Sequence, residues 1–283
     1  MLDFTLSKYR ELLEALVGAG YRLISFEQYL QTYQPDNLPT ASPIVPSNAR
    51  IRTCQPTDRF VILRHDIDKR GCLALQVAQI EREAGVGASY YFRVVPESNE
   101  PDIIRKIAEM GFEIGYHYED MSLANGDPVA AQKHFIKWLR YFRTYYPVRT
   151  VCMHGAPQSG YDSKDLWQYC DYHDFGIIGE PYFDTDFSQV VYLTDTGRRW
   201  DGYRVSVRDK IPQYQERWNK QGFVYHTTDD IIRAAKAGTL PERIMMTTHP
   251  QRWTDNPALW CYELLRQTLA NIVKRLMISQ KSQ

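Results

Sequence analysis

From Phe60 onward, the chain alternates between short apolar segments and segments with helical periodicity. The apolar segments predict strands at 60–66, 88–94, 112–117, 149–154, 175–178, 190–194, 203–207, 223–226 and 244–249. The periodic segments predict helices at 72–84, 101–111, 128–145, 163–169, 229–237 and 256–277. Strands that alternate with helices are typical of parallel βαβ units. About seven such repeats are too many for a small three-layer sandwich and enough to close a barrel, so we expect an α/β barrel.

The first 58 residues follow a different pattern. Residues 6–18 have the apolar spacing of a helix, and residues 21–26 have the composition of a short strand. Residues 34–58 contain five prolines among serine, threonine and asparagine, which predicts a long surface loop. We therefore expect one domain, in which residues 1–58 form a helix and a proline-rich loop packed on the barrel. Residues 59–283 would form the barrel itself and end in a long C-terminal helix.

Composition and charge exclude several classes of protein. Of the 283 residues, 43% are apolar and 24% are charged, as in globular chains. Lysine plus arginine equals aspartate plus glutamate at 34 each, and no basic block stands out, so we expect no nucleic-acid partner. The sequence contains no apolar run long enough to span a bilayer and does not start with a basic and then apolar leader. We therefore expect no membrane insertion and a cytoplasmic location.

The cysteine pattern agrees with a reducing compartment. The five cysteines are scattered, their number is odd, and no Cys-x-x-Cys pair occurs. We therefore expect free thiols. They are Cys54, Cys72, Cys152, Cys170 and Cys261.

The strongest functional signal lies at the end of the strand that begins at Phe60. The apolar run 61–63 favours a strand that is buried on both faces, and Asp66 and Asp68 follow it closely. Because side chains alternate along a strand, the two carboxylates point to the same side. Two like charges at the end of a buried strand need a cation, a proton or hydrogen-bond donors nearby. The structural alternative is a pair of solvated acids that cap the following helix.

Three of the seven histidines also stand at the ends of predicted strands. They are His117, His154 and His249, and a turn signal follows each of them. In a parallel barrel these strand ends share one face, so the histidines would meet Asp66 and Asp68 at one mouth. Aspartate and histidine together are ligands for a divalent cation such as zinc or iron. Taken singly, each histidine could instead be structural, for example by bonding a carbonyl or capping a turn.

Three short segments carry a more specific pattern. They are Arg-His-Asp-Ile-Asp at 64–68, Gly-Phe-Glu-Ile-Gly-Tyr-His at 111–117 and Thr-His-Pro at 248–250. In order and spacing, over about residues 58–250, the chain resembles the polysaccharide deacetylase superfamily (NodB-like, carbohydrate esterase family 4). The resemblance implies a distorted (β/α)7 barrel and one divalent metal ion, with zinc as the expected ion. It also implies that Asp66 is the general base, that Asp68 and His117 bind the metal, and that His249 is the general acid.

The sequence departs from the family at the second metal-binding histidine. The family's His-Ser/Thr-x-x-His motif begins here at His117, but Met121 stands at its last position. A zinc ion that keeps one position open for water needs about three protein ligands, and a thioether suits cuprous copper better than zinc. His154 ends the next predicted strand, beside His117 if consecutive parallel strands are neighbours. We therefore predict His154 as the third ligand, with Glu119 as the replacement candidate.

A second departure affects the expected arginine. The family's arginine-containing turn after the next strand is replaced by Met-His-Gly-Ala-Pro at 153–157. The segment 194–202 is dense in charge and glycine, and an arginine in it could orient Asp66 or bind an anionic group. A solvated loop is the alternative for this segment. The candidate substrate-binding residues are Arg198, Arg199 and Trp200.

Together with the resemblance, these residues predict a metal-dependent hydrolase of a carbon–nitrogen amide bond. The leading expectation is removal of an N-acetyl group from a sugar or sugar conjugate in surface-polysaccharide metabolism. Asp66 would take a proton from water, and His249 would protonate the leaving amine. One alternative is a barrel that binds a metal or a carbohydrate without catalysis, and another is a hydrolase of a small non-sugar amide. Met121 favours the non-catalytic alternative, whereas Asp66 and His249 disfavour it.

Overall fold

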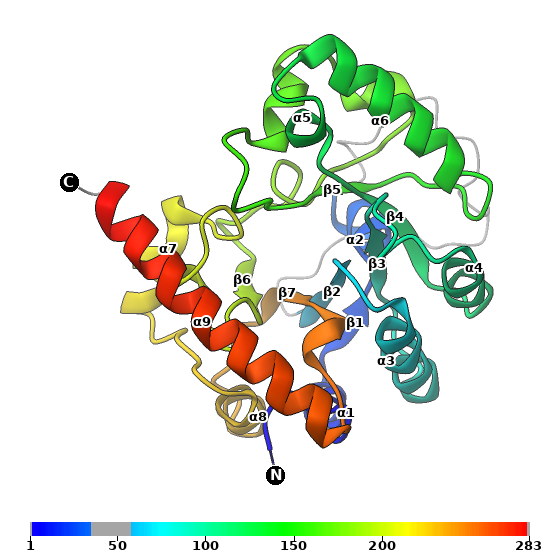
Figure 1. Ribbon diagram of the computed structural model, residues 1–283. Helices are drawn as coiled ribbons and strands as arrows, with labels where there is room; N and C mark the ends of the chain where they lie inside the picture. Colours follow the sequence, from blue (N-terminus) through cyan, green and yellow to red (C-terminus); the bar gives the residue numbers. More distant parts are fainter. Residues whose placement is uncertain (1, 35–57, 282–283) are drawn as a thin grey trace.

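The computed structural model describes residues 2–34 and 58–281 and contains one parallel sheet. Its strands are β1 Arg22–Ile24, β2 Phe60–Ile67, β3 Ser89–Phe92, β4 Glu113–Tyr118, β5 Val151–Met153, β6 Val191–Thr194 and β7 Arg243–Thr248. Six of them lie in the order β5-β4-β3-β2-β7-β6, and β1 pairs with the first half of β2. The sheet curls into a half-barrel, and within the described residues no ladder joins β5 to β6 (Figure 1). This α/β architecture is compatible with the barrel type expected from the sequence.

Helices surround the strands (Figure 1). They are α1 Leu6–Gly18, α2 Phe26–Tyr33, α3 Gly71–Ala84, α4 Pro101–Glu109, α5 Asp120–Leu123, α6 Pro128–Phe142, α7 Pro212–Lys220, α8 Thr228–Lys236 and α9 Pro257–Lys281. Short 3₁₀ turns are η2 Ser163–Gln168, η3 Tyr172–Phe175, η4 Gly202–Arg204 and η5 Pro250–Arg252. Each crossover therefore returns the chain to the same end of the sheet, as parallel pairing requires.

Strand β2 lies in the middle of the sheet and pairs with three other strands. Every residue of β2 is buried, as its continuous apolar run predicts. One side of β2 pairs with β7, and the other pairs first with β1 and then with β3. Because β1 belongs to the first 58 residues, this N-terminal part contributes a strand to the sheet as well as helix α1.

Several predicted elements are wrong. The expected strands 175–178, 203–207 and 223–226 are 3₁₀ turns or irregular segments, and the expected helix 163–169 is the 3₁₀ turn η2. Short apolar runs of this kind do not distinguish a strand from a buried turn, because both bury the same side chains. The proline-rich loop expected at 34–58 lies almost entirely outside the described residues.

Three helices, α2, α5 and α7, were not expected from the sequence. Ser25 begins α2 because its side chain accepts a hydrogen bond from the Gln28 backbone, while the Gln28 side chain accepts one from the Ser25 backbone. This capping box ends the expected strand 21–26 early, so that β1 is only three residues long. Phe26 and Leu30 then turn into the core.

Two further expectations concern the whole chain. No helix within the described residues is both long and apolar enough to cross a membrane. Among the same residues, the cysteines are free thiols, whereas Cys54 lies outside the described part.

Candidate metal centre and active site

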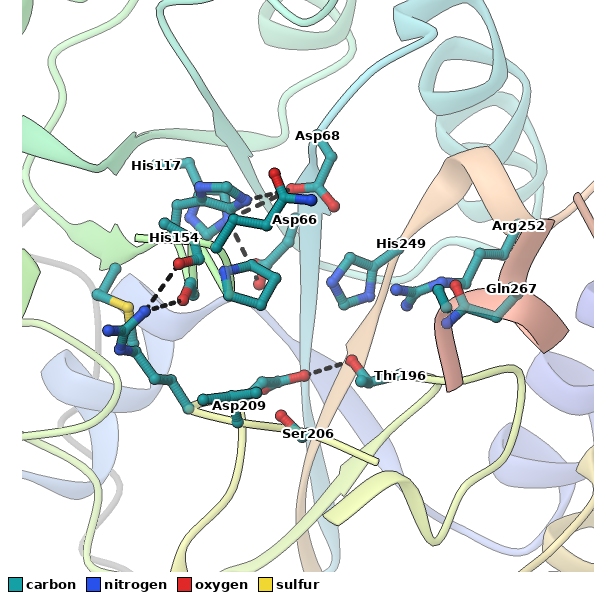
Figure 2. A pocket seen from close by; sticks show the side chains of 18 of the residues that line it. Asp66, Asp68, His117, His154, Thr196, Ser206, Asp209, His249, Arg252 and Gln267 are labelled. Carbon is teal, nitrogen blue, oxygen red and sulfur yellow. Dashed lines mark hydrogen bonds and ion pairs between the residues drawn. The ribbon is translucent and has the colours of Figure 1, made fainter. Parts of the chain in front are cut away.

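The carboxyl ends of the parallel strands bring the predicted site residues together. In the spatial order of the sheet these are His154 after β5, His117 in β4, Asp66 in β2, Asp68 just after β2, and His249 after β7. They line one cavity of about 380 Å³, which α9 borders on another side. Figure 2 shows the two aspartates beside His117 and His154, with His249 facing them across the cavity. The arrangement follows from parallel pairing, because all these strand ends lie at one edge.

The Asp68 carboxylate lies between two imidazoles. Its Oδ1 is 3.8 Å from Nε2 of His117 and 3.5 Å from Nε2 of His154. This oxygen is buried and accepts no hydrogen bond from the described residues, whereas Oδ2 accepts one of 3.0 Å from the Gln251 amide. A buried carboxylate oxygen without a donor is costly. Asp68, His117 and His154 therefore offer ligand types that a divalent metal ion takes, with the Asp68 oxygen facing both imidazoles.

Contacts of the other ring nitrogens orient both imidazoles. His117 Nδ1 is 2.9 Å from the Cys152 carbonyl, which can only accept, so Nδ1 carries the proton and Nε2 keeps a lone pair. His154 Nδ1 donates to the Glu119 carboxylate at 2.7 Å. Arg93 donates two further hydrogen bonds of 2.9 Å to Glu119. Such outer partners are typical of histidines that bind metals.

Electrostatics hold His117 and Asp68 in forms that bind a cation. Burial, with the nearby His154 imidazole, lowers the pKa of His117 to about 4, although the two aspartates oppose this. Near pH 7 the His117 ring is therefore neutral. Burial raises the pKa of Asp68, but the three facing imidazoles, led by His154, outweigh it and hold the pKa below its ordinary value. Burial likewise opposes the His154 and Arg93 contacts that lower the pKa of Glu119 to about 2.

A second set of candidate ligands shares His117. Ligand atoms of Asp66, His117 and Cys152 lie within 4.8 Å of one another, all three residues are buried, and this cluster could also hold a metal ion. A thiol binds metal as the thiolate, and burial raises the pKa of Cys152 well above its ordinary value. Asp66 already has a cationic partner in Arg64. An ion in this cluster would therefore compete with Arg64 for Asp66, whereas Asp68 Oδ1 has no hydrogen-bond donor among the described residues.

Arg64 holds Asp66 in a fixed orientation. The guanidinium donates from Nε to Oδ1 at 2.9 Å and from Nη2 to Oδ2 at 2.8 Å, and both side chains are buried. Nη2 also donates to the Tyr182 hydroxyl at 3.2 Å and lies 4.0 Å from Asp209 Oδ1. This bidentate pairing presents the carboxylate to the cavity in one position. Arg64 therefore occupies the orienting position that was expected of an arginine in 194–202.

His249 is held by a buried carboxylate on the opposite side of the cavity. Asp195 Oδ1 accepts from His249 Nδ1 at 2.7 Å, and Asp195 Oδ2 accepts from the His249 backbone at 2.9 Å. Asp195 also accepts hydrogen bonds from Arg252 and from Trp253 Nε1. Burial and Arg252 lower the pKa of His249, but Asp195 and Asp68 raise it more, so it lies above its ordinary value. This shift favours the protonated form of His249, whose Nε2 is the ring nitrogen not paired with Asp195.

The candidate substrate-binding residues 198–200 do not line this cavity. The Arg198 guanidinium lies over the rings of Phe4 and Trp260, 5.0 and 4.8 Å from their centroids. Arg199 pairs with Asp201 at 2.7 Å. The Trp200 indole is buried and donates to a threonine hydroxyl. All three side chains have structural partners away from the strand ends.

Neither Met121 nor Glu119 faces Asp68 as a third ligand. Met121 is buried in the hydrophobic core at the start of the α5–α6 region and does not line the cavity. Glu119 bonds the Nδ1 atom of His154, so its place is behind a ligand candidate.

Three residues of the site were missed or misjudged from the sequence. Arg64 stands two positions before Asp66, and strand alternation alone would have placed both on one side. Asp195 follows β6 directly, as the histidines follow their strands, but it lies in a segment weighed as a solvated loop. Asp209 lines the cavity and accepts hydrogen bonds from Tyr182 and from other hydroxyls, and no local pattern marks it.

We compared the chain with protein-family models, with curated proteins and with solved structures, and found no match in any of the three comparisons. The geometry of the site is therefore the basis for a functional proposal.

Proposed function

We propose that the protein is a metal-dependent hydrolase of a carbon–nitrogen amide, and that it removes an N-acetyl group from a sugar or sugar conjugate. One observation carries the proposal: the unsatisfied Asp68 Oδ1 faces Nε2 of both His117 and His154. An acid and a base stand at the same cavity, which a site that only binds a metal does not need. The distorted (β/α)7 barrel and the family resemblance are part of the same proposal.

Asp68, His117 and His154 would hold the metal ion. When bound, a divalent cation supplies Lewis-acid polarisation of the amide carbonyl and lowers the pKa of a neighbouring water. Zinc is the proposed ion, because one carboxylate and two imidazoles are ligands that it commonly takes.

The remaining residues would move protons. Asp66 accepts a proton from the attacking water, because the paired Arg64 guanidinium presents its carboxylate in one orientation. His249 donates a proton to the leaving nitrogen from Nε2, since Asp195 occupies Nδ1 and stabilises the imidazolium. The carboxylate and the imidazolium thus face the substrate from opposite sides of the cavity (Figure 2).

The proposal is tested by metal analysis together with an acetate-release assay. Protein purified without added metal is expected to contain about one equivalent of a divalent ion, and to release acetate from N-acetylated sugars. Chelation should abolish the release, and added zinc should restore it. Bound metal without turnover of any sugar or small amide would support the non-catalytic binding barrel instead. No bound metal, and no uptake on titration, would contradict the site itself.

The pH dependence of turnover tests the role of Asp195. His249 must be protonated to act as an acid, so kcat/KM should fall as the pH rises through its pKa in the free enzyme. Asp195 raises that pKa, and Asp195→Asn removes the charge that does so. We expect the alkaline limb of the kcat/KM profile to move to lower pH by about one unit or more. An unchanged limb in a folded Asp195→Asn variant would assign the proton donor elsewhere.

A further inference from the structure

A group of cations surrounds one buried acid beside the proposed metal centre. Glu263 of α9 is completely buried. Arg266 donates to it from Nε at 3.1 Å, Lys69 Nζ lies 3.5 Å from its Oε2, and Arg70 Nη1 lies 3.7 Å from the same oxygen. We call Lys69, Arg70, Arg266 and Glu263 the α9 cation cluster. Three cations against one carboxylate leave two positive charges in excess.

The excess charge is accessible on one side only. The Glu263 side chain is 0% exposed, whereas those of Lys69, Arg70 and Arg266 are 26%, 27% and 38% exposed. The acid therefore lies beneath the cations and anchors them, and their outer sides face solvent. The three cations repel one another, and this repulsion is relieved when an external anion binds.

Two guanidinium nitrogens at this place have no hydrogen-bond acceptor. Arg70 Nη1 and Arg252 Nε are buried and donate no hydrogen bond to any acceptor among the described residues. Arg252 is itself only 6% exposed and lines the cavity of the proposed active site. A buried donor without an acceptor is costly, so a ligand oxygen would stabilise it.

Two members of the cluster, Lys69 and Arg266, line cavities at the proposed metal centre. A second cavity, lined by Lys69, Arg266 and Gln251, shares Asp68 and His154 with the first, and Arg266 also lines both. Asp68 immediately precedes Lys69, and its charge contributes to the raised pKa of Arg266. A substrate whose amide lies at Asp68 would therefore place its next group against the cluster. The second cavity is also lined by the exposed Glu97, whose negative charge would repel a phosphate. The part of this cavity beside α9 is therefore the one that favours an anion.

We propose that the α9 cation cluster is a subsite for a phosphate group of the substrate, so that the N-acetylated sugar is bound as a phosphate-linked conjugate. This inference rests on the proposed function and extends it to the substrate class. Two positive charges in excess match a phosphate monoester or a diphosphate better than a single carboxylate. A nucleoside diphosphate sugar and a lipid diphosphate sugar share this chemistry, and the experiment below separates them.

The direct test is calorimetric titration of the full-length protein with inorganic phosphate at fixed ionic strength. Lys69→Gln and Arg266→Gln are each expected to weaken phosphate binding about tenfold, because each removes a charged donor. Glu263→Gln should have the opposite effect and tighten binding, because it removes the negative charge of the cluster. Arg105→Gln is the matched control, since Arg105 pairs with Asp102 on α4, outside both cavities, and its binding should equal wild type.

The opposite signs distinguish a binding role from a structural one. Loss of fold alone would weaken binding in all three cluster variants, and thermal melting with metal analysis of each variant identifies that case. Wild-type phosphate affinity in Lys69→Gln and Arg266→Gln, or no gain in a folded Glu263→Gln, would overturn the proposal.

The substrate arm uses matched N-acetyl sugars that are free, linked to a nucleoside diphosphate, or linked to a polyprenyl diphosphate. For the preferred conjugate, Lys69→Gln should raise KM about tenfold with little change in kcat, because Lys69 lines only the second cavity. KM for the free sugar should not change. The conjugate with the higher wild-type kcat/KM identifies the source of the phosphate. If no compound releases acetate, the proposed function fails, while the phosphate titration still decides the subsite.

Discussion

His154→Ala is expected to lower metal affinity as strongly as His117→Ala, by more than about 100-fold. The loss of a residue that only orients a metal ligand costs roughly 10–100-fold, and loss of a ligand should cost more. The reason is geometric, because His154 Nε2 lies 3.5 Å from the unsatisfied Asp68 Oδ1. Elemental analysis and competition with a chromogenic zinc chelator measure the effect. His173→Ala is the matched control, since His173 is a partly exposed histidine paired with Asp171.

Two further variants separate the alternative ligand sets. Glu119→Gln should weaken metal binding by an intermediate amount, roughly 10–100-fold, because Glu119 orients His154 and does not face Asp68. Cys152→Ala should leave metal affinity close to wild type, as the thiol is protonated and buried. The reverse result, in which Cys152→Ala loses the metal and His154→Ala keeps it, would assign the ion to Asp66, His117 and Cys152 instead.

Asp66→Asn is expected to reduce kcat by about 10²–10⁴-fold while metal content stays near wild type. The amide cannot accept the proton from water, and general-base catalysis contributes about this much. The variant should fold, because Asp209 remains 4.0 Å from Arg64 Nη2 and leaves the buried guanidinium a counter-charge. Steady-state acetate release and elemental analysis of the same preparation provide both measurements.

The comparison variant is Asp68→Asn, which should lose the metal and the activity together. Equal metal loss in both aspartate variants would show that Asp66 is a ligand and that the assigned roles are wrong. Full activity in Asp66→Asn would place the base elsewhere in the cavity, where Asp209 is a further, half-buried carboxylate.

Most of the site was predictable because its residues stand at strand ends. Parallel strands share one edge for their carboxyl ends, so a residue directly after a strand can be placed without knowing the strand order. This reasoning brought Asp66, Asp68 and the three histidines to one mouth, and the structure places them there. It also placed His154 next to His117, because β4 and β5 pair directly.

Site residues that do not stand at the end of a strand were not predictable. Asp209 lies in the irregular segment between η4 and α7, and it reaches the cavity only because four hydroxyl groups hold it there. The expected strands at 203–207 and 223–226 failed for the same reason, since local composition does not determine where irregular chain packs. The partners of Arg198 and Arg199 could not be predicted either, because charge density in a loop does not determine which way each side chain points.

The amino-acid sequence by itself determined the α/β class, the buried strand β2 and the identity of the groups at the strand ends, because periodicity and alternation act over a few neighbouring residues. The tertiary structure alone decided which nitrogen of each histidine faces Asp68, that Arg64 orients Asp66, and that Asp195 holds His249. It also decided that Glu263, near the C-terminal end of the chain, pairs with Lys69 and Arg70 as well as with its helix neighbour Arg266. Contacts between residues nearly 200 positions apart depend on how the helices pack around the sheet, and no local pattern carries that information.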